Sequence, residues 1–211
     1  YKAVMGSLIL TGHESGFIRI WDSSEGDLNT SKVFEIDISD ILERDDDSVT
    51  VSNISFANES LELSCSLKSG DVLLFSHGIN RVNSSAPRPS VTNLHNSARA
   101  LNNITDRASV NVRRGFLPKL LIKPLDNGLV TALNNSNIGL VAIGYESGRI
   151  LIIDRKTNSV AYNEVLKEQG LGLPIHAKSI EFGYGLSDKD TKPGAMIFVG
   201  TDIGRLLTYK I

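Results

Sequence analysis

The sequence predicts an all-β protein made of degenerate WD-repeat blades of a β-propeller, about half a propeller in extent. Four segments share one pattern, in which an apolar alternating run, a tight turn and a second apolar run follow one another. These segments are LILTGHESGFIRIWD, LELSCSLKSGDVLLF, LVAIGYESGRILIID and MIFVGTDIGRLLTYK. Two short apolar runs around a glycine-containing turn are typical of a β-hairpin, so the chain contains four copies of one hairpin.

The glycines of these hairpins support a repeat. Three turns have the form Gly-x-x-x-Gly, and Ser66 replaces the first glycine in the second copy. The closing glycines Gly16, Gly70, Gly148 and Gly204 are separated by 54, 78 and 56 residues. A glycine is favoured there because the turn needs a positive φ. Short strands recurring about every 40 to 50 residues are typical of four-stranded propeller blades, and the longer step indicates an insertion.

The other strands of each blade are expected beside the hairpins. Inner strands are predicted at 48–57, 129–136 and 175–183, and outer strands at 32–38, 117–125 and 159–166. The whole chain, 1–211, then divides into a blade end at 7–38, a blade at 48–124, a blade at 129–166 and an incomplete blade at 175–211. Because a blade buries its faces only against neighbours, we expect other sequence or partner chains to complete the arc.

Composition narrows the function classes. Hydrophobic residues make up 41% of the 211 residues, which is enough for a packed core and excludes disorder throughout. The net charge of −2 disfavours a nucleic-acid-binding protein. A single cysteine, Cys65, excludes an internal disulfide and fits a reducing compartment. The first residue is Tyr1 and no targeting pattern follows it, so we expect a piece of a longer chain.

The insert at 79–116 is the most distinctive segment. Between residues 79 and 124 there are eight basic residues and one acid, Asp106, a net charge of +7, which leaves −9 for the remainder. The insert is rich in Ser and Asn, which predicts a mobile loop rather than added strands, with a weak alternative of a short helix at 94–104.

Two interpretations of this insert remain open. It is either a solvated insertion, tolerated because loop length costs little free energy, or a basic tether for an acidic partner or an anionic membrane leaflet. The residues expected to make such contacts are Arg107, Arg113 and Arg114, and phosphorylation of Ser90 or Ser109 beside arginines would weaken them.

Single residues of the hairpins and loops indicate structure rather than chemistry. Trp21 and Asp22 form a WD dipeptide, and we expect Trp21 to pack between blades. His13 lies in a hairpin turn, where a polar surface residue is expected. The acidic run 45–47 lacks the spacing of a calcium loop and predicts a solvated loop. The four histidines have no metal-ligand spacing and no nucleophile elbow is present, so no catalytic, metal-binding or cofactor-binding residue is predicted, and no cofactor.

Three strings resemble the lethal giant larvae and tomosyn family. They are LILTGHESGFIRIWDSSEGDLNTSKVFEIDI, VTALNNSNIGLVAIGYESGRILIIDRK and AMIFVGTDIGRLLTYKI, which follow one another in the family's order. The residue before the closing glycine departs from the acid expected of a WD-repeat turn, being Ser15, Ser69, Ser147 and Ile203.

The resemblance implies a non-enzymatic regulator of polarised exocytosis. Members of this family are similar in having two large propellers and in binding SNARE proteins of the plasma membrane. Fungal members also engage a secretory Rab GTPase and the exocyst, so the expected location is the cytoplasm, peripherally associated with the plasma membrane. No SNARE-contact residue can be carried over. The alternatives are a generic WD-repeat scaffold for another complex, because a fold does not determine a function, and a propeller enzyme, for which clustered acids or histidines are lacking.

Overall fold

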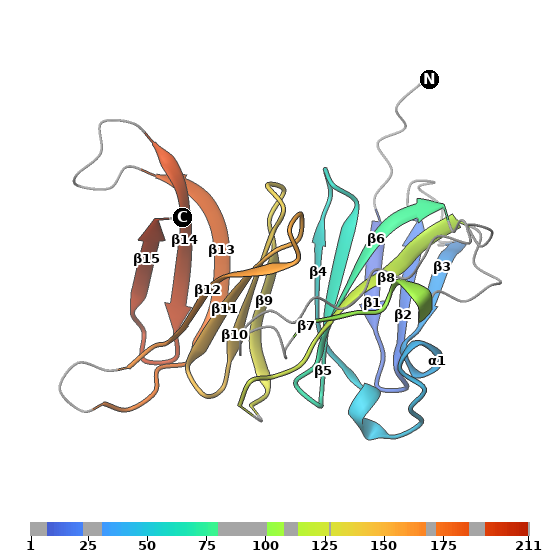
Figure 1. Cartoon of the computed structure of the whole chain (residues 1–211), viewed down its shortest axis with the longest axis horizontal. Helices are drawn as coiled ribbons and strands as arrows, with labels where there is room; N and C mark the ends of the chain where they lie inside the picture. The colour runs from blue at the N-terminus through green and yellow to red at the C-terminus, as the bar shows by residue number, and fades with distance from the viewer. Residues whose placement is uncertain are drawn as a thin grey trace.

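The computed structural model describes residues 8–22, 31–79, 101–107, 114–126, 128–167, 172–185 and 193–210. Four antiparallel sheets stand side by side along the longest axis of the molecule, in the order in which they occur along the chain (Figure 1). Each of the four repeated segments forms a hairpin in a different sheet, as the sequence predicts.

The strands are distributed over the sheets as follows. The first sheet contains β1 (Leu8–Gly12), β2 (Phe17–Asp22) and β3 (Ser31–Asp37), and is followed by the helix α1 (Ile38–Leu42) and the 3-10 helix η1 (Asp47–Val49). The second sheet has the spatial order β4 (Val51–Ala57), β5 (Glu62–Leu67), β6 (Val72–Ile79), β8 (Arg114–Ile122) and β7 (Leu101–Asn103), with the 3-10 helix η3 (Thr105–Arg107) between β7 and β8 in sequence. The third contains β9 (Val130–Asn135), β10 (Leu140–Tyr145), β11 (Arg149–Asp154) and β12 (Ser159–Val165), and the fourth β13 (Ala177–Gly185), β14 (Gly194–Thr201) and β15 (Leu206–Lys210).

The four repeated hairpins have the same turn geometry. The closing glycines Gly16, Gly70, Gly148 and Gly204 have φ of +79°, +83°, +81° and +75°. Each glycine amide donates to the carbonyl oxygen three residues earlier, at 2.9 to 3.1 Å. A β-carbon at Gly70 would lie 2.5 Å from the carbonyl oxygen of Gly128, so this turn requires glycine for space as well as for φ. The repeat inferred from glycine spacing is therefore present in the backbone.

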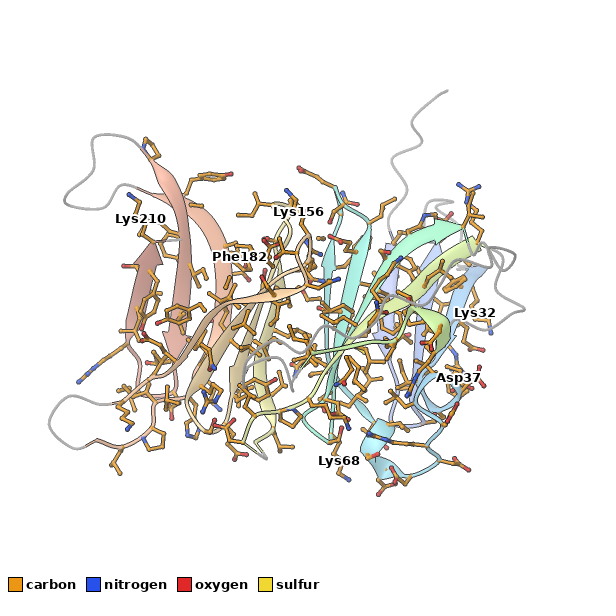
Figure 2. The ribbon with its side chains drawn as sticks, in the orientation of Figure 1. Lys32, Asp37, Lys68, Lys156, Phe182 and Lys210 are labelled. Carbon is orange, nitrogen blue, oxygen red and sulfur yellow. The ribbon has the colours of Figure 1, made fainter. Side chains whose placement is uncertain are left out.

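The hairpin turns define two rims of the molecule. In Figure 1 the turns that contain these glycines lie along the lower rim, and the β4–β5, β9–β10 and β11–β12 turns lie along the upper rim. Figure 2 places Lys68, in the β5–β6 turn, at the lower rim and Lys156, in the β11–β12 turn, at the upper rim. This geometry follows from strands that alternate in direction within each sheet.

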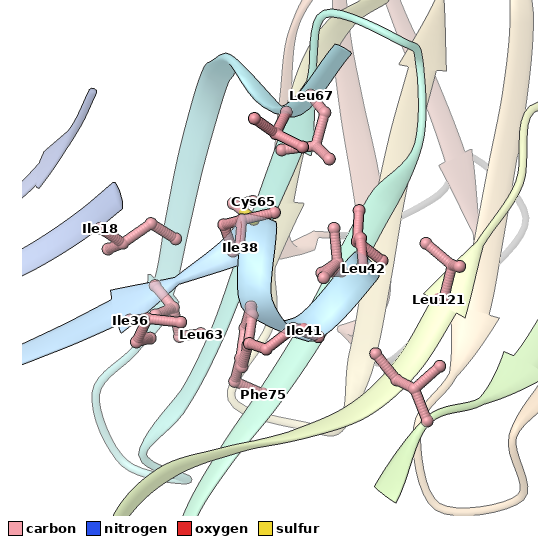
Figure 3. Packing of buried hydrophobic residues seen from close by; sticks show 13 residues of the cluster. Ile18, Ile36, Ile38, Ile41, Leu42, Leu63, Cys65, Leu67, Phe75 and Leu121 are labelled. Carbon is pink, nitrogen blue, oxygen red and sulfur yellow. The ribbon is translucent and has the colours of Figure 1, made fainter. Parts of the chain in front are cut away.

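Apolar clusters fill the spaces between consecutive sheets. The first cluster joins Ile18 and Ile36 of the first sheet, and residues of α1, to Leu63 and Cys65 of the second sheet (Figure 3). Side chains on β6 alternate, because Leu73 belongs to this cluster and Val72 belongs to the next one, against the third sheet. Both faces of the second sheet are thus buried, which explains its continuous apolar runs.

Polar side chains connect the inner strands of neighbouring sheets. The amide nitrogen of Asn135 on β9 donates to Ser55 Oγ on β4 at 2.8 Å, and the Asn135 side chain donates to the Ser55 carbonyl oxygen at 2.9 Å. Asn53 on β4 donates through Nδ2 to the carbonyl oxygen of Val130 at 3.2 Å. Asn53, Ser55 and Asn135 of the predicted inner strands therefore connect neighbouring sheets.

Two local elements differ from the sequence prediction. The segment at 48–50 is not strand, because the Asp46 carboxylate accepts a hydrogen bond from the Ser48 amide at 2.8 Å and caps the 3-10 helix η1. The strand predicted at 32–38 ends at Asp37, whose side chain accepts from the Asp40 amide and begins α1. In both places an aspartate offers the backbone a local hydrogen bond that competes with a sheet ladder.

The packing predicted for Trp21 is not observed in the described part of the chain. Trp21 is half-buried and lies outside the buried apolar clusters. Its indole N–H donates to Thr11 Oγ1 at 3.1 Å, and Thr11 Oγ1 lies 3.0 Å from His13 Nε2. Side chains alternate along β2, so Trp21 lies on the face opposite to the buried Ile18 and Ile20. The three polar groups instead form a chain across the first hairpin.

Candidate functional site

The described part of the insert is attached to the second sheet. Contrary to the prediction of a loop without added strands, β7 pairs antiparallel with β8 and becomes a fifth strand, with Leu101 opposite Ile122 and Asn103 opposite Leu120. Ile104 follows at 2% exposure, inside the apolar cluster between the first two sheets. Its amide donates to the carbonyl oxygen of Lys119 at 3.1 Å. Residues 101–104 of the insert are therefore held by one buried side chain and a short ladder.

The predicted contact residues occupy different positions. Arg107 ends η3 and is exposed, and its Nη1 donates to the carbonyl oxygen of Ile41 on α1 at 3.2 Å. Arg114 is exposed at the first residue of β8 and pairs with Ile79. Arg113 and the predicted phosphosites Ser90 and Ser109 lie outside the described residues. One of the three predicted arginines thus also links the insert to the helix α1 that follows the first sheet.

The acidic run at 45–47 has the features of a solvated surface segment. Asp45, Asp46 and Asp47 are exposed, as predicted for a solvated loop, and Asp46 caps η1. Within the described ranges, no group of three or more His, Cys, Asp or Glu side chains is arranged to hold a metal ion. The same part of the chain has no helix that is long and apolar enough to cross a membrane.

The single cysteine is a core residue. Cys65 on β5 is completely buried among the apolar side chains between the first two sheets. Burial raises the pKa of its thiol to about 12, so the reactive thiolate is scarce at neutral pH. Cys65 therefore acts as a small apolar side chain.

A polar pocket not predicted from the sequence lies between the second and third sheets. Its volume is about 300 Å³. Its second-sheet side is formed by residues of β5, β6, β8 and β7, among them Glu62, Ser76, Asn103 and Lys119. The third-sheet side is formed by residues of the β11–β12 turn, Arg155 and Asn158. The fifth strand that the insert adds therefore contributes to this pocket.

Arg155 is the most buried charge of this pocket. Its side chain is 6% exposed, with Nη1 2.5 Å from Glu62 Oε2 and Nη2 donating to the Ser136 carbonyl oxygen. Burial lowers the pKa of the Arg155 guanidinium, and the Glu62 carboxylate opposes that shift. The sequence signal was weak, because Arg155 merely follows the Ile153–Asp154 pair at the WD position, and its partners are more than 15 residues away in sequence.

Comparison with known families identifies the chain. A family model described as "Lethal giant larvae(Lgl) like, C-terminal" matches residues 48–211. The chain belongs to the lethal giant larvae (Lgl) family. The Lgl chain is 34% identical to "Lethal(2) giant larvae protein homolog SRO77" of Saccharomyces cerevisiae, over 97% of this chain and 21% of that protein. It is 28% identical to the uncharacterized protein C1F3.03 of Schizosaccharomyces pombe, over 92% of this chain and 19% of that protein. The chain spans about a fifth of the length of these relatives.

Solved structures similar to this Lgl chain confirm the propeller class. The Saccharomyces cerevisiae Sqt1 structure matches with a TM-score of 0.52 and 15% identity, over 97% of this chain and 42% of that chain. The β-propeller domain of Cps50 (Swd1) from Myceliophteria thermophila matches with a TM-score of 0.56 and 10% identity, over 97% of this chain and 50% of that chain. The four sheets are thus propeller blades, and coverage of about half of each similar chain agrees with the predicted half-propeller.

Proposed function

We propose that this Lgl-family chain is part of a non-enzymatic propeller protein that binds SNARE proteins of the plasma membrane and regulates vesicle docking and fusion in polarised exocytosis. The observation that carries this proposal is membership of the Lgl family, through a family-model match over 48–211 and 34% identity along nearly the whole chain. A secretory Rab GTPase and the exocyst are further partners under this proposal, and no nucleic-acid partner is proposed.

The polar character of the inner strands supports a binding role over an enzymatic one. Asn135 and Asn53 on these strands make hydrogen bonds with the neighbouring inner strand or its sheet, so they connect blades. The broad rims of the stacked blades offer surface for a protein partner instead (Figure 1). Binding surfaces on propellers are built from loops and rims on a rigid scaffold.

The basic insert supports a peripheral position at the plasma membrane. Its net charge of +7 between residues 79 and 124 contrasts with −9 for the rest of the chain. Each basic residue near an anionic leaflet contributes about 1 kcal/mol to membrane binding. Arg107, Arg113 and Arg114 are the proposed contacts with lipid or with an acidic partner, and phosphorylation at Ser90 or Ser109 would reduce the attraction.

The proposal is tested by co-immunoprecipitation of the complete natural protein from crosslinked cells, probed for SNAREs of the plasma membrane and of internal membranes. We expect enrichment of plasma-membrane SNAREs alone. Equal recovery of both sets, or of neither, would contradict the proposal and favour a scaffold for another complex.

A further inference from the structure

We infer that the pocket between the second and third sheets binds a compact oxyanion, a carboxylate or phosphate group on a side chain of a partner peptide. The pocket is built by side chains of Lys119, Asn103 and Thr105 on one side and of Arg155 and Asn158 on the other. The lining of the pocket includes none of the three arginines that we propose as contacts of the insert. The ligand is inferred from the charge and the volume of the pocket.

The charges of the pocket favour an anion. Lys119, Arg155 and Glu62 are its charged residues, so its net charge is positive. Glu62 is paired with Arg155 at 2.5 Å, which leaves the ammonium of Lys119 without a partner among the described residues. The Lys119 side chain is exposed on β8, whereas the Arg155 side chain is 94% buried. A charge that is held in a buried position by other contacts attracts an anion more strongly than one in open solvent.

Hydrogen-bond donors of the pocket are available to a ligand. Nε of Arg155 is buried and makes no hydrogen bond with any described residue, whereas Nη1 lies against Glu62 Oε2 and Nη2 donates to the Ser136 carbonyl oxygen. Such donors are costly when left unsatisfied, because burial removes the hydrogen bonds that water would supply. The side-chain amides of Asn103 and Asn158 add further donors to the lining of the pocket. An oxyanion accepts several such hydrogen bonds at once and would offset the cost.

The size of the pocket selects a small group. About 300 Å³ lies at the lower end of the range for small-molecule sites, roughly ten water volumes. An acidic or phosphorylated side chain fits within this volume. The position between two blades, with β7 at one side, also favours an extended peptide over a flat membrane surface.

Lysine footprinting of the complete natural protein tests the inference. The rate of reductive methylation is measured by mass spectrometry at Lys119 and at Lys156, which is exposed in the neighbouring β11–β12 turn but does not line the pocket (Figure 2). Inorganic phosphate or acetate is added at about 10 mM against sodium chloride of equal ionic strength. We expect the rate at Lys119 to fall at least about threefold and the rate at Lys156 to stay unchanged, as for a site with millimolar affinity. Protection by phosphate alone assigns a phosphorylated ligand, and protection by both anions assigns a carboxylate as well.

A charge variant provides an independent test. Glu62→Gln removes the competing carboxylate, so the same phosphate concentration is expected to protect Lys119 about twofold to fivefold more than in the natural protein. Equal slowing of methylation at both lysines, or no slowing at either, would overturn the inference, because it would show an effect of ionic strength or no site at all. The footprint of the natural protein stands on its own if Glu62→Gln does not fold.

Discussion

Truncation of Ile104 tests how the insert is attached. The side chain is 2% exposed within the cluster between the first and second sheets, and Ile104→Ala removes three of its carbon atoms. At about 0.8 kcal/mol per buried carbon, the substitution lowers the stability of the docked segment by about 2.4 kcal/mol, and the cavity that it leaves raises this cost to about 3 kcal/mol. Because β7 has only three residues, we expect local release of 101–107 rather than unfolding of the blades.

Hydrogen exchange measures this release directly. The amide at position 104 donates to the carbonyl oxygen of Lys119, and the Arg107 amide donates to the carbonyl oxygen of Ile104. The protection of both amides from exchange is expected to fall about 100-fold in Ile104→Ala. Ile104→Val removes one carbon, for which about a fivefold fall is expected. Amides of β10 in the third sheet serve as the internal control and should not change. Unchanged protection at Arg107 would refute anchoring by Ile104, and an equal fall in β10 would refute local release.

Three further predictions concern charge, reactivity and a buried hydroxyl. Changing Arg107, Arg113 and Arg114 together to Gln should weaken binding to vesicles of phosphatidylserine and phosphatidylcholine at least about tenfold at low salt, measured by sedimentation. Cys65, with a pKa raised to about 12 and no exposed surface, should react with a thiol reagent at neutral pH only as fast as the protein unfolds, followed by absorbance. Tyr145→Phe should raise the free energy of unfolding by about 1 kcal/mol in urea titrations, because the Tyr145 hydroxyl is buried without a hydrogen-bond partner among the described residues.

Each of these predictions has a control and a contrary outcome. Three exposed lysines of the third and fourth sheets, Lys156, Lys167 and Lys178, can be changed to Gln for an equal loss of charge, and an equal loss of vesicle binding would show that the insert has no special role. Rapid reaction of Cys65 in the absence of denaturant would contradict its placement in the core. Tyr162→Phe removes a hydroxyl that bonds Glu164 at 3.0 Å, and a larger stabilisation there than at Tyr145 would contradict the explanation.

The repeated hairpins could be predicted because their determinants are local. Each combines two apolar runs with a glycine whose positive φ no other residue adopts as easily, and both faces of a blade are apolar. The outer strands predicted at 117–125 and 159–166 are also apolar runs, and the structure has β12 at Ser159–Val165 and β8 at Arg114–Ile122, which begins and ends three residues before the predicted strand. Local periodicity thus contains most of the information about the blades.

The other features depend on contacts between distant residues. The three residues of β7 have no apolar alternation, and they form a strand because the exposed edge of β8 is available and Ile104 finds a buried site. The pocket requires Glu62 and Arg155, which are 93 residues apart and meet only when two blades stack. The polar chain from Trp21 through Thr11 to His13 was missed because the sequence indicates apolar packing for tryptophan. Such features need the folded arrangement before they can be inferred.

The proposal of SNARE binding is the central functional claim. The most direct measurement is the dissociation constant between the purified complete protein and a purified plasma-membrane SNARE, by isothermal titration calorimetry, beside a SNARE of an internal membrane at the same concentration. The account predicts micromolar or tighter affinity for the plasma-membrane SNARE and at least about tenfold weaker affinity for the other. Undetectable binding to the plasma-membrane SNARE at about 100 μM, or equal affinity for both, would contradict it.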